Sequence, residues 1–245
     1  MNNYKLIIQY DGGRYKGFQR LANGENTIQG KLEQVLSQML SKATEMIGCS
    51  RTDAGVHALA FVANFKTEIK LDTDKIKAYF NHYLPQDISI TEVSEAAENY
   101  HARYLARKKT YLYKIWNKEY SNPFLRKYSM HVVDKLDIAA MEAAGSYFIG
   151  AHDFTAFSNA KSKKKSMIRE IYDIDIKEED GLVQIRITGN GFLYNMARFM
   201  VGTLVEVGLG RMKAEEITGI LEDRIRDRTG DLADACGLYL EKVFY

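Results

Sequence analysis

Hydrophobic residues recur along the first half of the chain with the spacing of strands and helices. Apolar residues at every second position from 4 to 10 predict a strand that ends at the turn Asp11-Gly12-Gly13. Thr27 precedes apolar residues at three-and-four spacing, which predicts a capped amphipathic helix (Ile28, Leu32, Val35, Leu36, Met39 and Leu40). A strand over 59–65, a helix over 74–83 that Pro85 stops, and a strand over 88–93 complete this half.

The second half repeats this mixture. Its expected elements are a strand over 108–116, a helix over 137–148, antiparallel strands over 168–177 and 182–188 joined through Glu179-Asp180-Gly181, helices over 195–208 and 213–228, and a last strand over 238–244. Tyr111, Tyr113 and Ile115 share one face of the first strand. We therefore expect an α+β protein of two similar lobes, residues 1–104 and 105–245.

Composition places the chain among ordinary globular proteins. Hydrophobic residues make up 46% and charged residues 27% of 245 residues, so disorder and a collagen-like sequence are excluded. Cys49 and Cys236 are too few for a disulfide framework or a zinc cluster, and a reducing cytoplasm is the expected location. The most apolar stretch, 196–209, is interrupted by Arg198 and Glu206 and is too short to span a bilayer.

The formal net charge of +2 conceals a separation of charge along the chain. Residues 100–135 hold nine Lys and Arg against two acids, a net charge of +7, and residues 161–169 add +5 without an acid. The remaining residues carry −10. Such segregation can build a basic face for nucleic acid on a nearly neutral protein, although Lys161–Lys165 taken alone is equally typical of a solvated loop.

Several familiar chemistries lack their motifs. Gly189-Asn190-Gly191 begins like a dinucleotide loop but has no third glycine, and the sequence contains neither a phosphate-loop lysine motif nor H-E-x-x-H. The five histidines are scattered without the spacing of metal ligands (His57, His82, His101, His131 and His152). We therefore expect no metal site and no nucleotide cofactor.

Two segments carry candidate chemistry. Asp53 lies in G-C-S-R-T-D-A-G-V-H-A, where Gly55 permits a tight turn before a strand. By local chemistry alone, the favoured interpretation of Asp53 is a turn aspartate that bonds its own backbone. Arg198 lies in the middle of a largely apolar helix, where its permanent charge needs an anion. That anion is Asp53 or another acid such as Glu206, unless the side chain extends outward to solvent.

These segments closely resemble the tRNA pseudouridine synthase A (TruA) family. The family signature R-T-D-x-G-V-H-A is matched in full by Arg51–Ala58. Seven stretches match family motifs in order: Tyr10–Gln19, Thr27–Glu33, Arg51–Ala58, Phe80–Ile88, His101–Tyr113, Gly150–Phe154 and Gly189–Arg198. Departures are Phe18 where many members have Trp, Ser50 where Gly is common, and Ala197 for the usual Val.

The resemblance implies isomerisation of uridine to pseudouridine at positions 38 to 40 of the tRNA anticodon stem-loop, without a cofactor. It implies that Asp53 is the catalytic aspartate and that Arg198 pairs with it. Tyr111 would stack on the target base, and Arg51 would occupy the space that the flipped base leaves. The family fold has two RRM-like lobes whose antiparallel sheets flank a basic active-site cleft, usually in a homodimer.

The residue types suit this chemistry. A carboxylate can attack the sugar or remove its C2′ proton, and a nearby arginine keeps a carboxylate ionised. An aromatic ring compensates part of the cost of unstacking a base, although Tyr111 or its neighbour Tyr113 could equally be a core tyrosine. Lys163, Lys164 and Lys165 are candidate tRNA contacts. The competing hypotheses are an RNA-binding protein without catalysis and a metal- or water-dependent hydrolase.

Overall fold

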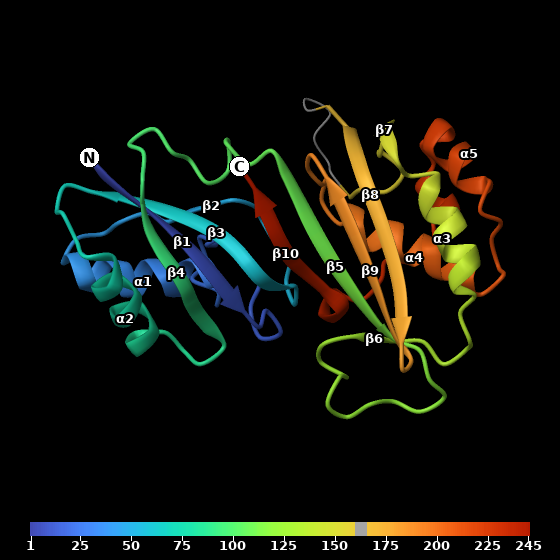
Figure 1. Cartoon of the computed structure of the whole chain (residues 1–245), viewed down its shortest axis with the longest axis horizontal. Coiled ribbons are helices and arrows are strands. Elements are labelled where there is room, and N and C mark those ends of the chain that lie inside the picture. Colours follow the sequence, from blue (N-terminus) through green and yellow to red (C-terminus); the bar gives the residue numbers. More distant parts are fainter. Residues whose placement is uncertain (160–165) are drawn as a thin grey trace. The chain divides into compact units, whose positions relative to one another are not determined.

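The computed structural model describes residues 1–159 and 166–245, which form two compact units (Figure 1). The first unit consists of Met1–Arg107 and Tyr239–Tyr245, and the second of Lys108–Leu238. Each unit combines a β-sheet with helices, so the expected α+β class is confirmed. Lys163, Lys164 and Lys165 lie outside the described residues.

The first unit has a mostly antiparallel sheet in the order β4-β1-β3-β10. Strands β3 (His57–Thr67) and β4 (Ile88–Ala96) run antiparallel to β1 (Asn2–Tyr10) on its two sides. The short strand β2 (Ile47–Gly48) also pairs with β3. Strand β10 (Leu238–Phe244) lies parallel to β3, with Tyr239 opposite His57.

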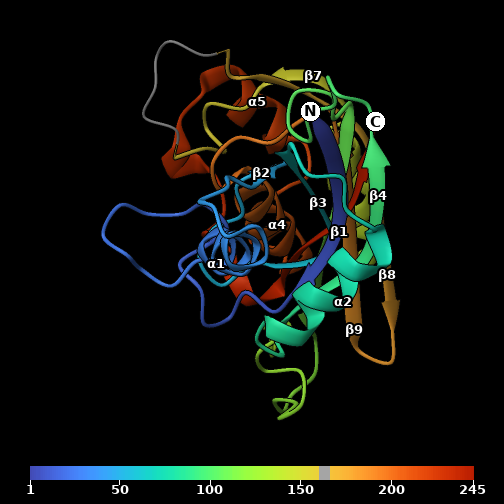
Figure 2. The same ribbon diagram turned by 90° about the vertical axis from the view of Figure 1, so that its left-hand side faces the viewer.

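Helices α1 (Ile28–Leu40) and α2 (Thr73–Tyr83) lie on the same side of these strands (Figure 2). The expected cap is confirmed, because the Thr27 hydroxyl accepts a hydrogen bond from the Gly30 amide at 3.2 Å. Alternate residues of β1 (Tyr4, Leu6 and Ile8) are at most 1% exposed and form the core of this unit. The predicted alternation of 4 to 10 therefore sets the buried face of the sheet.

The second unit has a sheet in the order β5-β9-β8-β7. Its strands are β5 (Lys108–Trp116), β9 (Leu182–Gly189), β8 (Ile168–Glu179) and β7 (Gly150–Asp153), all antiparallel to their neighbours, and β6 (Met130–His131) runs parallel to β5. The β8–β9 turn is made by Asp180 and Gly181, both with positive φ, as a two-residue hairpin turn requires.

The described part of this unit contains three α-helices: α3 (Ile138–Ser146), α4 (Met196–Gly208) and α5 (Glu216–Asp223). Helix α4 is buried along nearly its whole length, as its apolar composition predicts. Single 3₁₀ turns follow at Arg226–Arg228 and Ala235–Gly237. Within the described residues, no helix has both the length and the apolar character needed to cross a membrane.

Two sequence expectations differ from the structure. The helix expected over 213–228 is shorter, because Arg224 takes a left-handed conformation (φ 60°) and ends α5 after Asp223. The last strand was expected in the C-terminal lobe, but from Tyr239 onward it belongs to the first unit. Hydrophobic alternation predicts a strand without specifying its partner, so the pairing of β10 with β3 could not be read from the pattern.

Candidate active site

Asp53 lies in a tight turn immediately before β3. The Val56 amide donates to the Asp53 carbonyl at 3.2 Å, and Gly55 supplies the positive φ of 81° that closes the turn. The Asp53 side chain is half-buried, whereas Arg51, two residues earlier, is exposed. The Asp-Ala-Gly sequence therefore specifies a turn that presents a carboxylate at a strand end.

A second segment, residues 10–18, packs directly against this turn. The Tyr10 hydroxyl lies 2.8 Å from the Thr52 hydroxyl, and the Phe18 amide donates to the Thr52 carbonyl at 3.1 Å. The Gly55 amide donates to the Tyr15 carbonyl at 3.3 Å. These three contacts hold the backbone on both sides of Asp53.

Glycines allow this close approach. A Cβ at Gly12 would lie 1.9 Å from the Val56 carbonyl oxygen, and one at Gly17 would lie 2.6 Å from the Thr52 carbonyl oxygen. Gly17 also has a φ of 94°. Any side chain at either position would push the two segments apart. Spacing alone did not single out these residues, because their partners are about 40 positions away in the sequence.

The turn is braced further by Asp87, which lies just before β4. The Asp87 carboxylate accepts the Tyr15 hydroxyl at 2.6 Å and forms an ion pair with Arg14, and its carbonyl accepts the Asp11 amide at 2.9 Å. Burial, and then the hydrogen bond to Asp87, raise the pKa of Tyr15 to about 12. Tyr15 therefore stays protonated as a donor at neutral pH.

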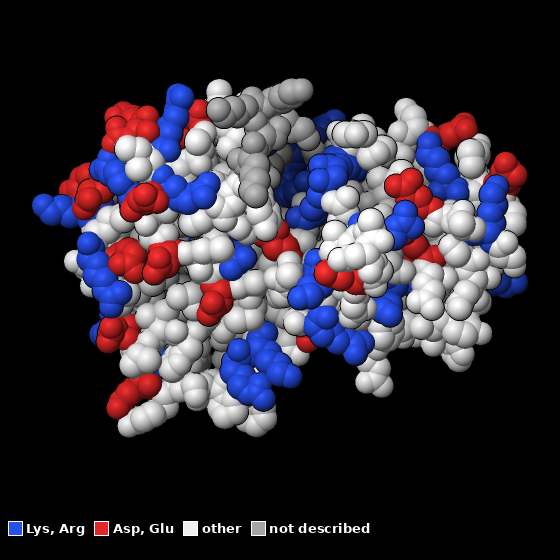
Figure 3. Space-filling model, turned by 180° about the vertical axis from the view of Figure 1, so that it is seen from behind, with Lys and Arg blue, Asp and Glu red and all other residues white. Residues whose placement is uncertain are grey.

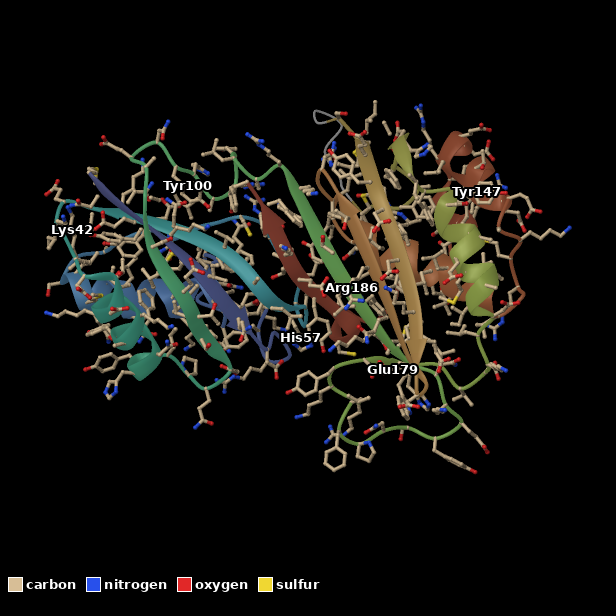
Figure 4. The ribbon with its side chains drawn as sticks, viewed as in Figure 1. Lys42, His57, Tyr100, Tyr147, Glu179 and Arg186 are labelled. Atoms are coloured by element: carbon tan, nitrogen blue, oxygen red, sulfur yellow. The ribbon has the colours of Figure 1, made fainter. Side chains whose placement is uncertain are left out.

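His57 is a buried side chain that packs within the first unit. It begins β3 (Figure 4), is 2% exposed, and stacks on Tyr239 of β10 with the ring centroids 4.8 Å apart. Its Nδ1 lies 3.1 Å from both the Gly12 amide nitrogen and an Asp11 carboxylate oxygen. No group of three or more His, Cys, Asp or Glu side chains suited to a metal ion occurs within 1–159 and 166–245.

Tyr111 and Tyr113 have different environments on the same face of β5. Tyr113 is 1% exposed, and its hydroxyl donates to the Asp234 carbonyl at 2.7 Å. Burial raises the pKa of Tyr113 well above its ordinary value. Tyr111 is 6% exposed, and its ring makes a T-shaped contact with that of Phe192, with the ring centroids 4.9 Å apart. Both rings are therefore buried, and the hydroxyl of Tyr113 is bonded within the second unit.

Arg198 is half-buried and lies in the first turn of α4, not in the middle of the helix as expected, because the helix begins only at Met196. Its Nε donates to the Ala233 carbonyl at 2.6 Å and its Nη1 to the Asn195 side-chain oxygen at 3.4 Å. Glu206, considered above as a partner for Arg198, instead forms an ion pair with Arg211 at 3.6 Å. Both oxygens that bind Arg198 are neutral, and a guanidinium has further N–H groups that can bind an anion.

A close backbone contact fixes the position of the Ala233 carbonyl, which accepts the hydrogen bond from Arg198. A Cβ at Gly202 of α4 would lie 1.7 Å from the Asp231 carbonyl oxygen, and one at Gly230 would lie 2.5 Å from the Gly202 backbone. The Gly230 amide also donates to the Thr203 hydroxyl at 3.0 Å. Residues 230–234 therefore lie directly on α4, which fixes the carbonyl that receives the Arg198 side chain.

The structure thus positions the candidate residues within each unit. In the first unit it brings Arg51 and Asp53 onto one supported turn. In the second unit Tyr111 and Arg198 belong to neighbouring elements around Tyr113 and residues 233–234. Lys and Arg side chains are exposed on both units, in several groups (Figure 3). Sequence reasoning gave no role to Tyr15 and Asp87, although both lie in matched motifs, or to Gly202; their contacts are with residues distant in the sequence.

Comparison with known proteins identifies the family to which the chain belongs. The family model for tRNA pseudouridine synthase matches residues 6–105 and 144–245. The chain is 62% identical over 243 residues to tRNA pseudouridine synthase A 2 of Bacillus cereus, which covers 99% of each sequence. It is 58% identical to tRNA pseudouridine synthase A of Bacillus sp. (strain KSM-64) and 45% identical to that of Acetivibrio thermocellus, over the full length of both chains in each case. The chain therefore belongs to the tRNA pseudouridine synthase A family and is a pseudouridine synthase, an isomerase.

Proposed function

We propose that this enzyme converts uridine to pseudouridine at positions 38 to 40 of the tRNA anticodon stem-loop, as a cytoplasmic homodimer without a cofactor. The observation that carries the proposal is the Asp53 turn, which Gly55 closes and residues 10–18 hold through Thr52 and Gly55. Such support is what a catalytic carboxylate needs, because a small displacement of a reacting group costs orders of magnitude in rate. A simple surface turn needs no such packing.

Asp53 is the proposed catalytic residue, and Arg198 its proposed ion-pair partner. The two neutral oxygens that bind Arg198 orient its guanidinium without cancelling its charge. An ion pair to Arg198 would keep the Asp53 carboxylate ionised and aimed at the sugar. Tyr111 is the proposed stacking platform for the target base, because its ring already packs against an aromatic neighbour, Phe192, on the second unit.

The reaction is balanced without any co-reactant. The bond between uracil N1 and the sugar C1′ breaks, the base turns, and a bond from C5 to C1′ forms; the proton lost from C5 is replaced by one gained at N1. Asp53 acts either as nucleophile at the sugar or as the base that removes the C2′ proton. Before this step the uridine must leave its stack, and Arg51 is proposed to fill the space it vacates.

Replacing the carboxylate by an amide of the same shape tests the role of Asp53. Asp53→Asn should lower single-turnover pseudouridine formation in unmodified tRNA at least about 1000-fold, since the amide is neither a base nor a nucleophile. The dissociation constant for tRNA should change less than about threefold. Asp173→Asn, an exposed aspartate on β8, is the matched control and should keep wild-type turnover.

Two outcomes would contradict the proposal. Wild-type turnover in Asp53→Asn would remove Asp53 from the chemistry. Pseudouridine formed by the wild-type enzyme only outside positions 38 to 40 would replace the proposed target while leaving the reaction intact. Mapping pseudouridines in tRNA from cells with and without the enzyme distinguishes these outcomes.

A further inference from the structure

Residues 117–136 form a long loop between β5 and α3 that exposes large aromatic side chains. Phe124 is 87% exposed and Tyr120 is 76% exposed. The two-residue strand β6 is the loop's only strand, and no helix interrupts it. Loops of this length without further regular structure are usually functional or disordered.

This loop is ordered by its own hydrogen bonds. The Asn122 side-chain oxygen accepts the amides of Phe124 and Leu125 at 3.0 and 3.3 Å, as an N-cap does. Pro123 follows at the position where proline favours a helical start, and the Arg126 amide closes the turn on the Asn122 carbonyl at 3.0 Å. Phe124 therefore projects from a defined helical turn.

The base of the loop is tied to the second unit. The Trp116 indole donates to the Tyr120 carbonyl at 2.8 Å, and the Asn117 side-chain amide donates to the carbonyls of Val132 and Asp134 at 2.8 Å. The His131 ring nitrogen lies 2.8 Å from the Lys118 carbonyl oxygen. These bonds fix the exposed rings in water, where nothing within the unit compensates the exposure of so large an apolar surface.

Basic side chains flank these rings. Lys118, Arg126 and Lys127 are all exposed, and the turn from 118 to 128 contains a single acid, Glu119. We propose that loop 117–136 binds the tRNA substrate, with Phe124 and Tyr120 stacking on unpaired bases and the basic side chains contacting phosphates. This combination of aromatic faces and cations is what single-stranded nucleic acid recognition requires.

Charge favours RNA over a second copy of the chain. In a two-fold dimer contact centred on Phe124, Arg126 and Lys127 would approach the same two residues of the partner. Like charges brought together in this way oppose association, whereas RNA phosphates attract them. The inference rests on the proposed function, since it takes tRNA as the substrate.

The loop contacts a part of the RNA other than the target base. At about 3.3 Å per residue, β5 separates Tyr111 from Trp116 by roughly 17 Å. The effect of the loop should therefore appear in tRNA affinity and specificity. A contact made only with the reacting nucleotide could not span that distance.

Equilibrium binding of unmodified tRNA to purified full-length variants tests this proposal. Phe124→Ala should weaken binding roughly tenfold, and Phe124→Trp should stay within about twofold of wild type because it keeps an aromatic face. Arg126→Ala with Lys127→Ala should reduce the slope of log affinity against log salt concentration. Tyr172→Ala removes a ring that is 44% exposed on β8 beside Glu170 and Asp173, and should bind tRNA as wild type does.

Sedimentation velocity on the same proteins separates RNA binding from self-association. Wild-type affinity in Phe124→Ala overturns the proposal, and so does a loss of dimer in that variant, because the loop would then be a protein interface. The proposed function fails by a different result, namely that the wild-type enzyme forms no pseudouridine in tRNA. If the wild type does not bind tRNA at all, both proposals are wrong.

Discussion

At the scale of single residues, the position of Asp53 depends on a side chain that takes no part in the proposed chemistry. The Tyr15 carbonyl accepts the Gly55 amide, and the Tyr15 hydroxyl donates to Asp87 at 2.6 Å. Asp87 is thus connected to the Asp53 turn through Tyr15. Because the hydroxyl is buried beside a carboxylate, Tyr15 keeps its proton to an unusually high pH, with a pKa of about 12.

Removing this hydroxyl should make stability less dependent on alkaline pH. Between about pH 10 and 12 an unfolded Tyr15 loses its proton while the folded one keeps it, so the free energy of unfolding falls as pH rises. Tyr15→Phe lacks this contribution. Urea unfolding at pH 9 should show it less stable than wild type by about 1 kcal/mol.

At pH 11 that difference should shrink by about 1 kcal/mol, which the same urea titration measures. Tyr147→Phe, which removes the hydroxyl of a tyrosine that is 37% exposed after α3 (Figure 4), is the control for the substitution itself. If wild type and Tyr15→Phe differ in stability by the same amount at pH 9 and pH 11, the wild-type Tyr15 hydroxyl does not titrate as expected.

At the scale of elements, the second unit depends on how closely residues 230–234 approach α4. Two glycines facing each other, Gly202 and Gly230, let the backbones touch, and the Thr203 hydroxyl bonds across the contact. This contact places the Ala233 carbonyl where Arg198 reaches it. The glycine in the middle of α4 lowers helix propensity, but the packing it permits positions a candidate active-site residue.

A methyl group at this contact should therefore destabilise the unit. Gly202→Ala should lower the free energy of unfolding by about 1–3 kcal/mol and reduce turnover, because the segment that orients Arg198 must move. Gly219→Ala in α5 is the matched control: its new methyl would meet only Arg228 at 3.5 Å, so a stabilisation of up to about 1 kcal/mol is expected.

Thermal and urea unfolding, together with single-turnover assays, measure both variants. Equal stability changes in Gly202→Ala and Gly219→Ala would show that the contact between α4 and residues 230–234 is not tight in solution. Loss of stability without loss of turnover would separate packing from the positioning of Arg198.

At the scale of the whole molecule, the distribution of charge matters more than its total. The net charge of +2 combines +7 over residues 100–135 and +5 over 161–169 with −10 in the rest of the chain. The larger basic segment contains Tyr111 and the exposed turn around Phe124. A protein of nearly zero net charge can bind RNA strongly if its cations are grouped in this way.

The basic segment 161–169 allows a test of whether such grouped cations bind tRNA. Replacing Lys163, Lys164 and Lys165 together by alanine should weaken tRNA binding and lower the slope of log affinity against log salt concentration by about 2. A triple alanine variant of Lys70, Lys75 and Lys77, in and just before α2, removes the same charge and should keep most of the slope. Binding titrations from about 50 to 200 mM salt measure both. Equal slopes in the two triple variants would mean that Lys163–Lys165 make no specific contact with tRNA.

The sequence by itself determined most elements, because strands and helices impose their periods on neighbouring residues. Alternation defined β1 and β5, and Thr27 marked the start of α1. The motifs around Asp53 and Arg198 identified the family and the candidate residues. All of these features depend on residues within about ten positions of each other.

Only the tertiary structure decided which distant segments support the candidate residues. It showed that β10 pairs with β3 in the first unit, that the Tyr113 hydroxyl bonds the Asp234 carbonyl, and that Glu206 forms an ion pair with Arg211. It also showed that Asp87 reaches the Asp53 turn through Tyr15 and that Gly202 admits residues 230–234. Such contacts depend on close packing and hydrogen-bond geometry between residues far apart in the chain, for which local hydrophobic periodicity carries no information.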